Sequence, residues 1–270
     1  FCYTIFMSDP RELFKNTARY YSQYRKGYPK VFFNYVIKEF NLDSNSRTLD
    51  LGVGTGQIAI PLSFNVKEII AVDSEQEMLD EGKRVADEKN AHNITWVQLQ
   101  AENISKDFGM FNATTIGAAF HWMDRKIVLE KIYDITKKGG GVVIASDLTR
   151  GTAPDSGEVW KEARKRLVEK YLGKRRRAGN SFYERGEDKF EDRLTHSPFG
   201  GYKVWHYDFQ RKWTLEEVIK FLYSTSFSSR RFFGRKIKAF EQELTQKLLH
   251  IEPSGIFQEE VRLEALVAKK

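Results

Sequence analysis

The sequence predicts an α/β fold: a doubly wound, mostly parallel sheet of seven strands with a helical cap or insertion. Two observations predict it. Between residues 47 and 147, short apolar runs typical of strands alternate with longer stretches of helical periodicity. A glycine-rich segment directly follows the first of these runs and opens a helical pattern. Repeated strand–helix units imply parallel strands joined by right-handed crossovers.

The first half of the chain supplies five of the expected strands. They lie at residues 48–52, 68–73, 94–99, 113–120 and 141–145. Helices are expected at residues 31–40, 57–63, 75–89 and 127–136. The run at 113–120 is nearly all apolar, which is typical of a strand buried on both faces.

The second half has a different pattern. Strands are expected at 202–213 and 260–268, and helices at 155–172, 215–223 and 236–249. Residues 174–201 have mixed charge and several glycines, so they are expected to form a loop. Asp9 and Pro10 predict a helix start, because Asp caps helices and Pro suits the first helical position.

These elements predict one domain over residues 1–270. Its ligand-binding core is expected at 31–150, with cap segments at 1–30 and 151–201. Residues 202–270 are expected to complete the sheet and to contribute to the pocket for a second ligand. This division follows the change from regular strand–helix alternation to charged, irregular sequence near residue 150.

The composition excludes several classes of protein. Cys2 is the one cysteine, so no disulfide can form within the chain, and the five histidines lack H-x-x-x-H spacing, so we expect no metal. No apolar run is long enough to span a bilayer, and residues 1–6 lack the basic region of a signal peptide. We therefore expect a cytoplasmic protein with no membrane partner. The oligomeric state, and whether the native chain starts at Met7, are left open.

Positive charge is concentrated in one segment. The net charge is +7, and residues 161–177 contain nine basic and two acidic side chains. Such a run is typical of a solvated helix face. The alternative is an electropositive lid over an anionic acceptor.

The segment from Leu49 to Gln57 reads LDLGVGTGQ and carries the main functional signal. Glycines let the backbone approach a ligand closely, and N–H groups at the following helix start face it. Asp73 ends the next strand about twenty residues on, where a carboxylate can accept from both ribose hydroxyls. Asp50 suits a cationic group such as an ammonium and is a poor neighbour for a pyrophosphate. Gln57 also departs from the G-x-G-x-x-G/A pattern of NAD sites, so the charges favour adenosylmethionine.

Five motifs in order extend this signal: LDLGVGTGQIA, AVDSEQEML, QAEN, IGAAFHWMDR and KKGGGVVIAS. The chain resembles small-molecule class I methyltransferases of the methyltransferase type 11 group, with a Rossmann-like sheet. YRKGYP and AFHWMDR most resemble trans-aconitate-methyltransferase-like proteins. The resemblance covers residues 20–147, about half the chain. It implies the cofactor S-adenosyl-L-methionine, the product S-adenosyl-L-homocysteine and no metal.

Matching positions imply roles around the methionine and ribose parts of this cofactor. Gly52, Gly54 and Gly56 would line them, with Asp50 near the ammonium and Asp73 on the ribose. Ala118 and Ala119 would place backbone carbonyls near the methionine part. Arg25 would pair with the methionine carboxylate, and Tyr21, or its neighbours Tyr20 and Tyr24, would close over the site. Alternatively, the glycines form only a tight turn, Asp73 caps a helix, and Arg25 packs with the tyrosines at the surface.

Three further positions match the adenine side of the family's site. Met78 would pack on the ring, and Ala101 and Glu102 would hold its edge, with Glu102 accepting from the amino group. The alternatives are a core methionine and a surface acid. His121 follows the fourth strand beside the expected reactive methyl. It is a candidate general base, or else it orders the pocket.

The resemblance favours methylation of a small molecule at O, N or C, with a carboxylate or other anionic acceptor. An alternative is a nucleic-acid methyltransferase, which the charge allows. Against it, the position after the fourth strand reads AAFHW and lacks the Asn/Asp-Pro-Pro-Tyr/Phe motif of base-amino methyltransferases. A non-catalytic adenosylmethionine-binding protein and an NAD(P)-dependent oxidoreductase are the remaining alternatives.

Overall fold

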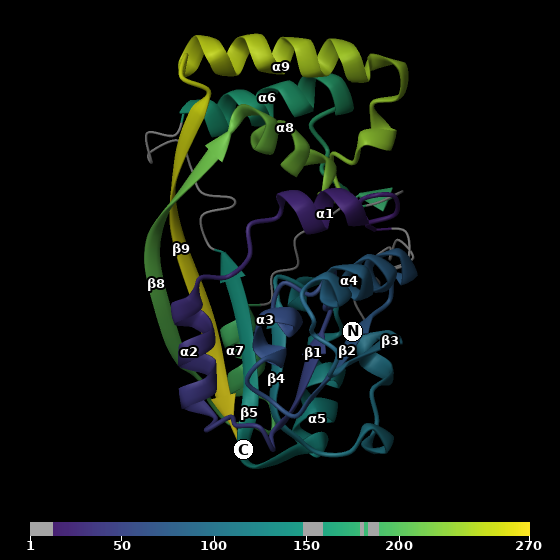
Figure 1. The fold of residues 1–270 in the computed structure, drawn as a ribbon, viewed down its shortest axis with the longest axis vertical. Coiled ribbons are helices and arrows are strands. Elements are labelled where there is room, and N and C mark those ends of the chain that lie inside the picture. The colour runs from purple at the N-terminus through teal and green to yellow at the C-terminus, as the bar shows by residue number, and fades with distance from the viewer. Residues whose placement is uncertain (1–12, 148–158, 179–180, 183–188) are drawn as a thin grey trace. The chain divides into compact units, whose positions relative to one another are not determined.

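A seven-stranded sheet runs through the described residues, which are 13–147, 159–178, 181–182 and 189–270 of this computed structural model. Five parallel strands stand in the order β3-β2-β1-β4-β5 (Figure 1). They are β1 (Arg47–Leu51), β2 (Glu68–Asp73), β3 (Ile94–Gln98), β4 (Phe111–Gly117) and β5 (Thr136–Asp147). β9 (Ile256–Lys269) pairs antiparallel with β5, and β8 (Lys203–Thr214) lies outside β9. The predicted α/β, mostly parallel, doubly wound sheet is confirmed.

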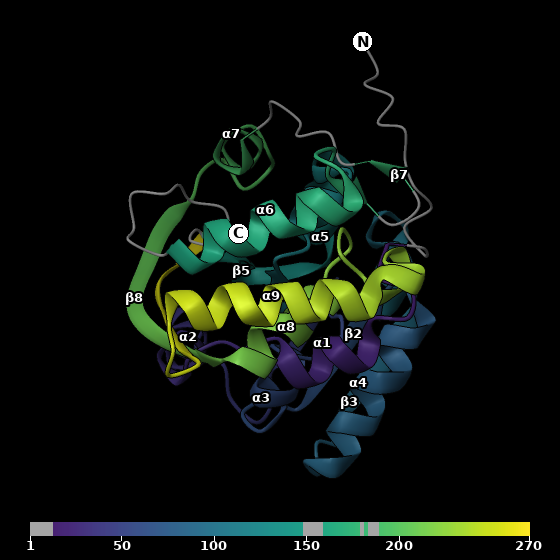
Figure 2. The same ribbon diagram turned by 90° about the horizontal axis from the view of Figure 1, so that it is seen from above.

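Helices cover both faces of this sheet. α3 (Ala59–Ser63) and α4 (Gln76–Glu88) lie on one face, and α5 (Arg125–Ile135) and α7 (Phe190–Thr195) on the other (Figure 2). α2 (Lys30–Glu39) buries Phe32 and Val36. Because both faces are covered, the central strands are buried on both sides, and residues 113–116 of β4 are buried without alternation.

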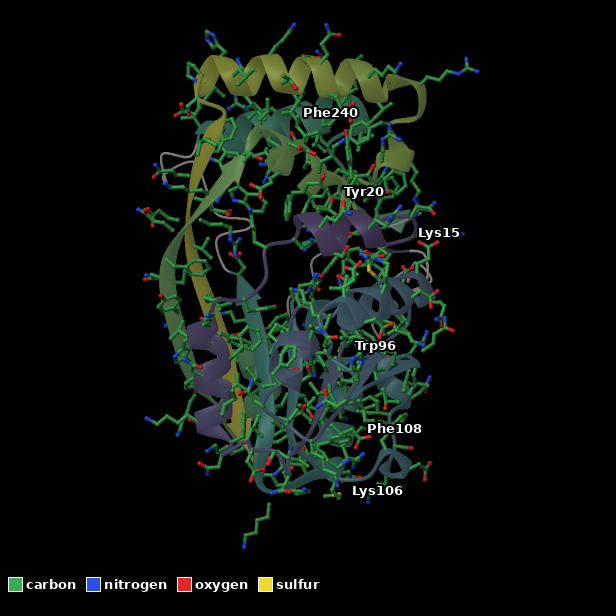
Figure 3. The ribbon with its side chains drawn as sticks, in the orientation of Figure 1. Lys15, Tyr20, Trp96, Lys106, Phe108 and Phe240 are labelled. Carbon is green, nitrogen blue, oxygen red and sulfur yellow. The ribbon has the colours of Figure 1, made fainter. Side chains whose placement is uncertain are left out.

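Two glycines show how closely these layers approach. A Cβ on Gly141 of β5 would lie 2.0 Å from the carbonyl oxygen of Ala268 on β9. A Cβ on Gly82 of α4 would lie 2.6 Å from the ring of Trp96, the β3 side chain labelled in Figure 3. Glycine disfavours a helix interior. At Gly82 it is required because the helix packs directly on the indole.

The chain divides into two compact units. The sheet unit comprises Lys26–Asp147, Gly186–Tyr207 and Leu263–Lys270, and the helical unit Phe1–Arg25, Leu148–Arg185 and Asp208–Arg262. β8 and β9 each pass from one unit into the other. The single domain expected over residues 1–270, with its cap segments, remains a prediction.

The helical unit has its own apolar core. It contains α1 (Ala18–Tyr24), α6 (Val159–Leu172), α8 (Leu215–Tyr223) and α9 (Ile237–Ile251), and α6 and α9 lie side by side (Figures 1 and 2). Phe240, labelled in Figure 3, is fully buried. Its ring contacts those of Tyr171 and Phe233. α8 begins with a capping box, in which the side chains of Thr214 and Glu217 each accept from the other's backbone N–H.

The buried carboxylate of Glu259 connects β8 and β9 with α6. Glu259 on β9 accepts from the indole Nε1 of Trp213 on β8 at 2.6 Å. It also lies 2.8 Å from Nζ of Lys161 on α6 and 3.3 Å from Nη1 of Arg211. Glu259 is 5% exposed, so this network is screened little by solvent.

The structure differs from the sequence-based elements in several places: β5 begins at Thr136 and β9 at Ile256, each earlier than expected. Residues 174–201 are not a simple loop: β6 (Arg177–Ala178) pairs with β7 (Ser181–Phe182), and α7 buries Leu194 against α5. α1, which contains Tyr20, Tyr21 and Tyr24, was not predicted. β4 ends at Gly117 and not at Phe120, because Ala118 adopts a positive φ of 53°. The helix start at Asp9 and Pro10, and the first four residues of the helix expected at 155–172, lie outside the described residues.

Candidate functional site

The loops after β1 and β4 meet at the point where the strand order reverses. β1 and β4 are neighbours, and the chain proceeds from β1 towards β2 and β3 on one side and from β4 towards β5 on the other. In doubly wound sheets, ligands bind outside the carboxyl ends of the strands at such a switch point. The predicted site residues of the sheet unit lie in β1, at the last residue of β2, or in the segments that follow β1–β4.

The glycine turn after β1 is shaped by backbone geometry. Gly52, Gly54 and Gly56 have φ angles of 66°, 55° and 87°, which glycine adopts without strain. The N–H groups of Gly52 and Val53 donate to the carbonyl of Val72 at 2.8 and 3.0 Å. These positive φ angles explain why glycine occupies the three positions of the turn. Their contact with a cofactor stays a prediction.

The turn also touches the loop after β4. A Cβ on Gly52 would lie 2.4 Å from Cβ of Ala119, so no larger residue fits without moving one loop. Ala118 has a φ of 53°, and its N–H donates to the carbonyl of Ala145 at 2.9 Å. The predicted residues after β1 and β4 are therefore brought into direct contact.

Asp73 joins the ends of neighbouring strands. Its Oδ2 accepts from the backbone N–H of Gly54 at 2.8 Å, and its Oδ1 accepts from that of Glu75 at 3.0 Å. Burial raises the pKa of this carboxyl, and the backbone N–H donors oppose the rise. Asp73 thus shapes the turn and starts α4, while remaining partly exposed. Each carboxylate oxygen has room for a further donor such as a ribose hydroxyl.

Asp50 is buried behind the glycine turn. It is 2% exposed, accepts from the hydroxyl of Thr115 at 2.8 Å through Oδ1, and accepts from the N–H of Ala59 at 3.1 Å through Oδ2. Burial raises its pKa to about 7, and the charge of Asp73 adds to the rise. Sequence reasoning missed Thr115. The sequence carries no separate signal for it, because the neighbouring Thr114 of β4 is buried as well.

The three residues predicted for the adenine side surround the next two strand ends. Met78 in the first turn of α4 and Ala101 after β3 are buried, at 2% and 7% exposed. Glu102 accepts from the backbone N–H of Asp124 at 2.7 Å, and Asp124 caps α5 by accepting from Ile127. Glu102 therefore links the segment after β3 to α5.

His121 and Trp122 follow the loop after β4 as predicted. Their ring centroids are 4.5 Å apart, and both side chains are partly buried. Tyr28 was missed, although it stands in the YRKGYP motif. A Cβ on Gly117 would lie 2.6 Å from its hydroxyl oxygen, so Tyr28 lies against the end of β4.

Arg25 and Tyr21 belong to the helical unit. Arg25 donates through Nε to Oγ of Ser224 at 3.0 Å and through Nη2 to the carbonyl of Ser224 at 3.1 Å. Its guanidinium also lies 4.5 Å from the ring centroid of Tyr21. The predicted contacts of both residues with a cofactor stay predictions.

Within the described residues, no three His, Cys, Asp or Glu side chains are placed to hold a metal ion. None of the described helices has the length and apolar character needed to cross a membrane.

Comparisons with known proteins identify the domain. Residues 48–140 match the family model described as a methyltransferase domain. This stretch contains the glycine turn and the ends of β1–β4. The chain carries a class I methyltransferase domain. Domains of this class use S-adenosylmethionine. Membership of the type 11 group, and of its trans-aconitate-methyltransferase-like proteins, remains a prediction.

Individual relatives agree with this assignment. An uncharacterized methyltransferase-like protein of Schizosaccharomyces pombe is 27% identical over 215 residues, which is 79% of this chain and 77% of the yeast protein. A demethylmenaquinone methyltransferase of Staphylococcus saprophyticus is 32% identical over 128 residues, covering 46% of this chain and 54% of that enzyme. The chain thus spans about half the length of the bacterial enzyme. The solved structure of a methyltransferase from Anaeromyxobacter dehalogenans has a TM-score of 0.58 at 15% identity, covering 90% of this chain and 96% of that one, and shows the same fold.

Proposed function

We propose that this chain transfers the methyl group of S-adenosyl-L-methionine to a small-molecule acceptor that carries a carboxylate or another oxyanion. The observation that carries the proposal is the pair of carboxylates, Asp50 and Asp73, bonded around the glycine turn at the strand ends. Asp73, together with Asp50 in its ionised form, favours a cationic ligand and opposes a pyrophosphate. The close approach at Gly52 leaves backbone, and not side chains, to face the ligand.

The residues fit the cofactor without a metal. Asp73 would accept from the ribose hydroxyls, Glu102 would accept from the adenine amino group, and Met78 would lie beside the ring. Asp50 would lower the energy of the ammonium, directly or through a water molecule. The cofactor supplies an activated methyl group when bound. The chain's part is to hold it in line with the acceptor, which can supply most of the rate.

His121 would take a proton only from an acceptor that must lose one. Its position directly after the loop that contacts Gly52 supports this role. Ordering of the pocket through the neighbouring Trp122 is the alternative. Tyr28, whose hydroxyl lies against Gly117 at the end of β4, is a second side chain that would face the acceptor.

The acceptor class rests on charge and on resemblance. The chain has a net charge of +7, and residues 161–177 are strongly basic. One relative is named for demethylmenaquinone, a small molecule. The motifs YRKGYP and AFHWMDR resemble those of trans-aconitate-methyltransferase-like proteins, whose acceptor is a carboxylate.

Calorimetric titration with S-adenosyl-L-methionine, S-adenosyl-L-homocysteine and NADH tests the proposal. We expect micromolar binding of the first two and none of NADH. Asp73→Asn should weaken cofactor binding about 100-fold, because its amide nitrogen would face a backbone N–H donor or a ribose hydroxyl. Asp80→Asn, on the exposed side of α4, is the matched control and should bind normally. Equal affinity of both variants, or binding of NADH, would contradict the proposal.

A further inference from the structure

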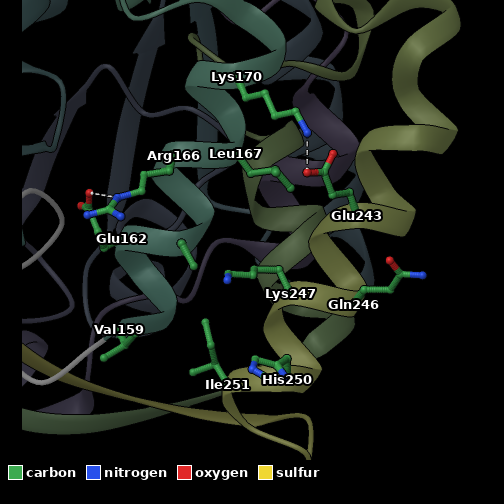
Figure 4. A pocket seen from close by; sticks show the side chains of 11 residues that line it. Val159, Glu162, Arg166, Leu167, Lys170, Glu243, Gln246, Lys247, His250 and Ile251 are labelled. Atoms are coloured by element: carbon green, nitrogen blue, oxygen red, sulfur yellow. Dashed lines mark hydrogen bonds and ion pairs between the residues drawn. The ribbon is translucent and has the colours of Figure 1, made fainter.

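A groove lies between α6 and α9, wholly within the helical unit (Figure 4). Its volume is about 660 Å³. Pockets that hold a whole small molecule measure about 300–1,000 Å³. Residues 159–170 of α6 line the groove, so it is about 16 Å long at the rise of an α-helix. A groove of this size matches one small molecule with an extended chain.

An apolar stripe of α6 lines this groove. Val159, Ala163 and Leu167 recur every four residues, so they lie on one face of the helix. Ile251, the last residue of α9, lines the groove from the other helix. Leu167 is 7% exposed, whereas Val159 is 63% exposed. The stripe therefore leads from the core to open apolar surface, which the chain of a ligand would remove from water.

The two acidic side chains that line the groove are neutralised within the helical unit. Glu243 lies 2.5 Å from Nζ of Lys170 and accepts from the hydroxyl of Tyr171 at 2.9 Å. Glu162 lies 2.8 Å from Nε of Arg166. Hydrogen bonds from these donors lower the pKa of both carboxyls. Both acids are therefore ionised and paired, and so are the two cations of α6 that line the groove.

Lys247 lines the same groove and has no such partner. Its side chain extends from α9 towards α6 (Figure 4). No hydrogen bond or ion pair joins Lys247 to another residue in the part of the chain that the structure describes. Its ammonium thus leaves one positive charge uncompensated beside the apolar stripe. A ligand with an anionic head and an apolar chain would match both features.

We infer that the groove between α6 and α9 is a binding site for an amphiphilic small molecule with a carboxylate head and an apolar chain. The ammonium of Lys247 pairs with the carboxylate, and the stripe from Val159 to Leu167 covers the chain. A stable protein interface covers about 800 Å² on each partner, which calls for a larger surface than one short groove. The site goes beyond the proposed function, because none of the predicted cofactor residues lines the groove.

Calorimetric titration of the full chain with decanoate, below the concentration at which micelles form, tests the inference. We expect saturable binding. Butyrate has the same head and a short chain, and decylammonium has the same chain and the opposite charge. Each should bind at least about tenfold more weakly than decanoate, because butyrate leaves the stripe in water and decylammonium is repelled by Lys247.

Two variants with matched controls test the two halves of the site. Lys247→Gln should weaken decanoate binding at least about tenfold, because it removes the charge that meets the carboxylate. Lys238→Gln, at an exposed position of α9 outside the groove, should stay within about twofold. Ala163→Phe fills the groove and should weaken binding at least about tenfold. Ala239→Phe, exposed on α9 outside the groove, should not.

Thermal melts show that each variant is folded. Three results would overturn the site: no saturable binding of decanoate, equal affinity for decylammonium, or unchanged affinity in folded Lys247→Gln or Ala163→Phe. Titration of the same preparation with S-adenosyl-L-methionine separates the two proposals. A chain that binds the cofactor but not decanoate refutes only the groove site, and the reverse result refutes only the proposed cofactor site.

Discussion

The two units satisfy their buried charges in different ways. In the sheet unit, Asp73 accepts from the backbone N–H groups of Gly54 and Glu75, and Asp50 accepts from the N–H of Ala59 and the hydroxyl of Thr115. In the helical unit, Glu259 is bound by the side chains of Lys161 and Trp213, which come from other elements. Backbone donors are fixed by the local turn, whereas side-chain donors depend on how distant elements pack.

This difference predicts what a substitution does. Changes at the glycine turn should alter ligand binding more than global stability, because the sheet beneath is held by its own core. Changes to the Glu259 network should lower stability and leave the ligand-binding turn intact. The predictions below test this contrast from the largest expected effect to the smallest.

Glu259→Ala should cause the largest loss of stability. The carboxylate is 5% exposed and faces two cations, Lys161 and Arg211, and removing one partner of a buried ion pair costs about 3–5 kcal/mol. Urea unfolding measures the loss. Glu260→Ala, at the exposed neighbouring position, should cost less than about 1 kcal/mol. Similar losses in both variants, or loss of cofactor affinity in folded Glu259→Ala, would contradict the contrast.

Gly52→Ala should abolish cofactor binding, with affinity at least about 100-fold lower. The added Cβ would lie 2.4 Å from that of Ala119, so the loop after β4 must move. Gly139→Ala is the matched control: its φ of 81° imposes similar backbone strain, but nothing lies within 4 Å of its Cβ. It should lose about 1 kcal/mol of stability and bind the cofactor normally. Calorimetry and thermal melts on both variants separate the clash from the strain.

The sequence was sufficient to predict β1–β5 of the sheet unit because the signals of these strands are local. Hydrophobic periodicity and composition locate β1–β5. Three glycines and two acidic residues indicate the turn after β1. Thr115 was missed, because the sequence does not show that its hydroxyl lies within hydrogen-bond distance of Asp50. Tyr28 was missed for the same reason, since its contact with Gly117 joins distant segments.

The helical unit could be predicted only in part. α8 and α9 follow from helical periodicity, but α1 and the β6–β7 pair do not, and neither does α7 of the sheet unit. α7 is stabilised by burial of Leu194 against α5 and not by helix propensity, so residues 174–201 have the composition of a loop. The arginines of residues 161–177 read as one basic run. The structure pairs some of them with carboxylates, such as Arg166 with Glu162, and places Arg177 over the rings of Phe182 and Phe232.

Asp50→Asn should change how stability depends on pH. Burial raises the pKa of Asp50 to about 7. The folded chain therefore keeps the carboxyl proton up to that pH, whereas the unfolded chain releases it at pH about 4. The stability that it contributes is complete below pH about 4 and is lost as the pH rises to about 7. We expect the free energy of unfolding of the wild type to fall by about 1 kcal/mol per pH unit in this window, relative to the variant.

Asp43→Asn is the control of opposite sign. Hydrogen bonds from Ser46 and Asn45 lower the pKa of Asp43, so its contribution is present above its ordinary pKa and is lost only at more acidic pH. Between pH 5 and 7 the free energy of unfolding of this variant should change with pH as that of the wild type does. Parallel profiles for Asp50→Asn as well would show that Asp50 is ionised in the folded chain throughout.

Glu102→Gln should have the smallest effect and separates two roles of one side chain. The carboxylate accepts from the N–H of Asp124, and glutamine keeps that acceptor, so stability should change by less than about 0.5 kcal/mol. If Glu102 also accepts from the adenine amino group, an amide turned towards it lowers cofactor affinity about threefold to tenfold. Asp124→Ala gives the converse: it removes the cap of α5 at a cost of about 1 kcal/mol and should leave affinity unchanged. Unchanged affinity in Glu102→Gln would restrict this residue to holding α5, and would place recognition of adenine with the buried Met78 and Ala101, so that shape and not hydrogen bonding selects the base.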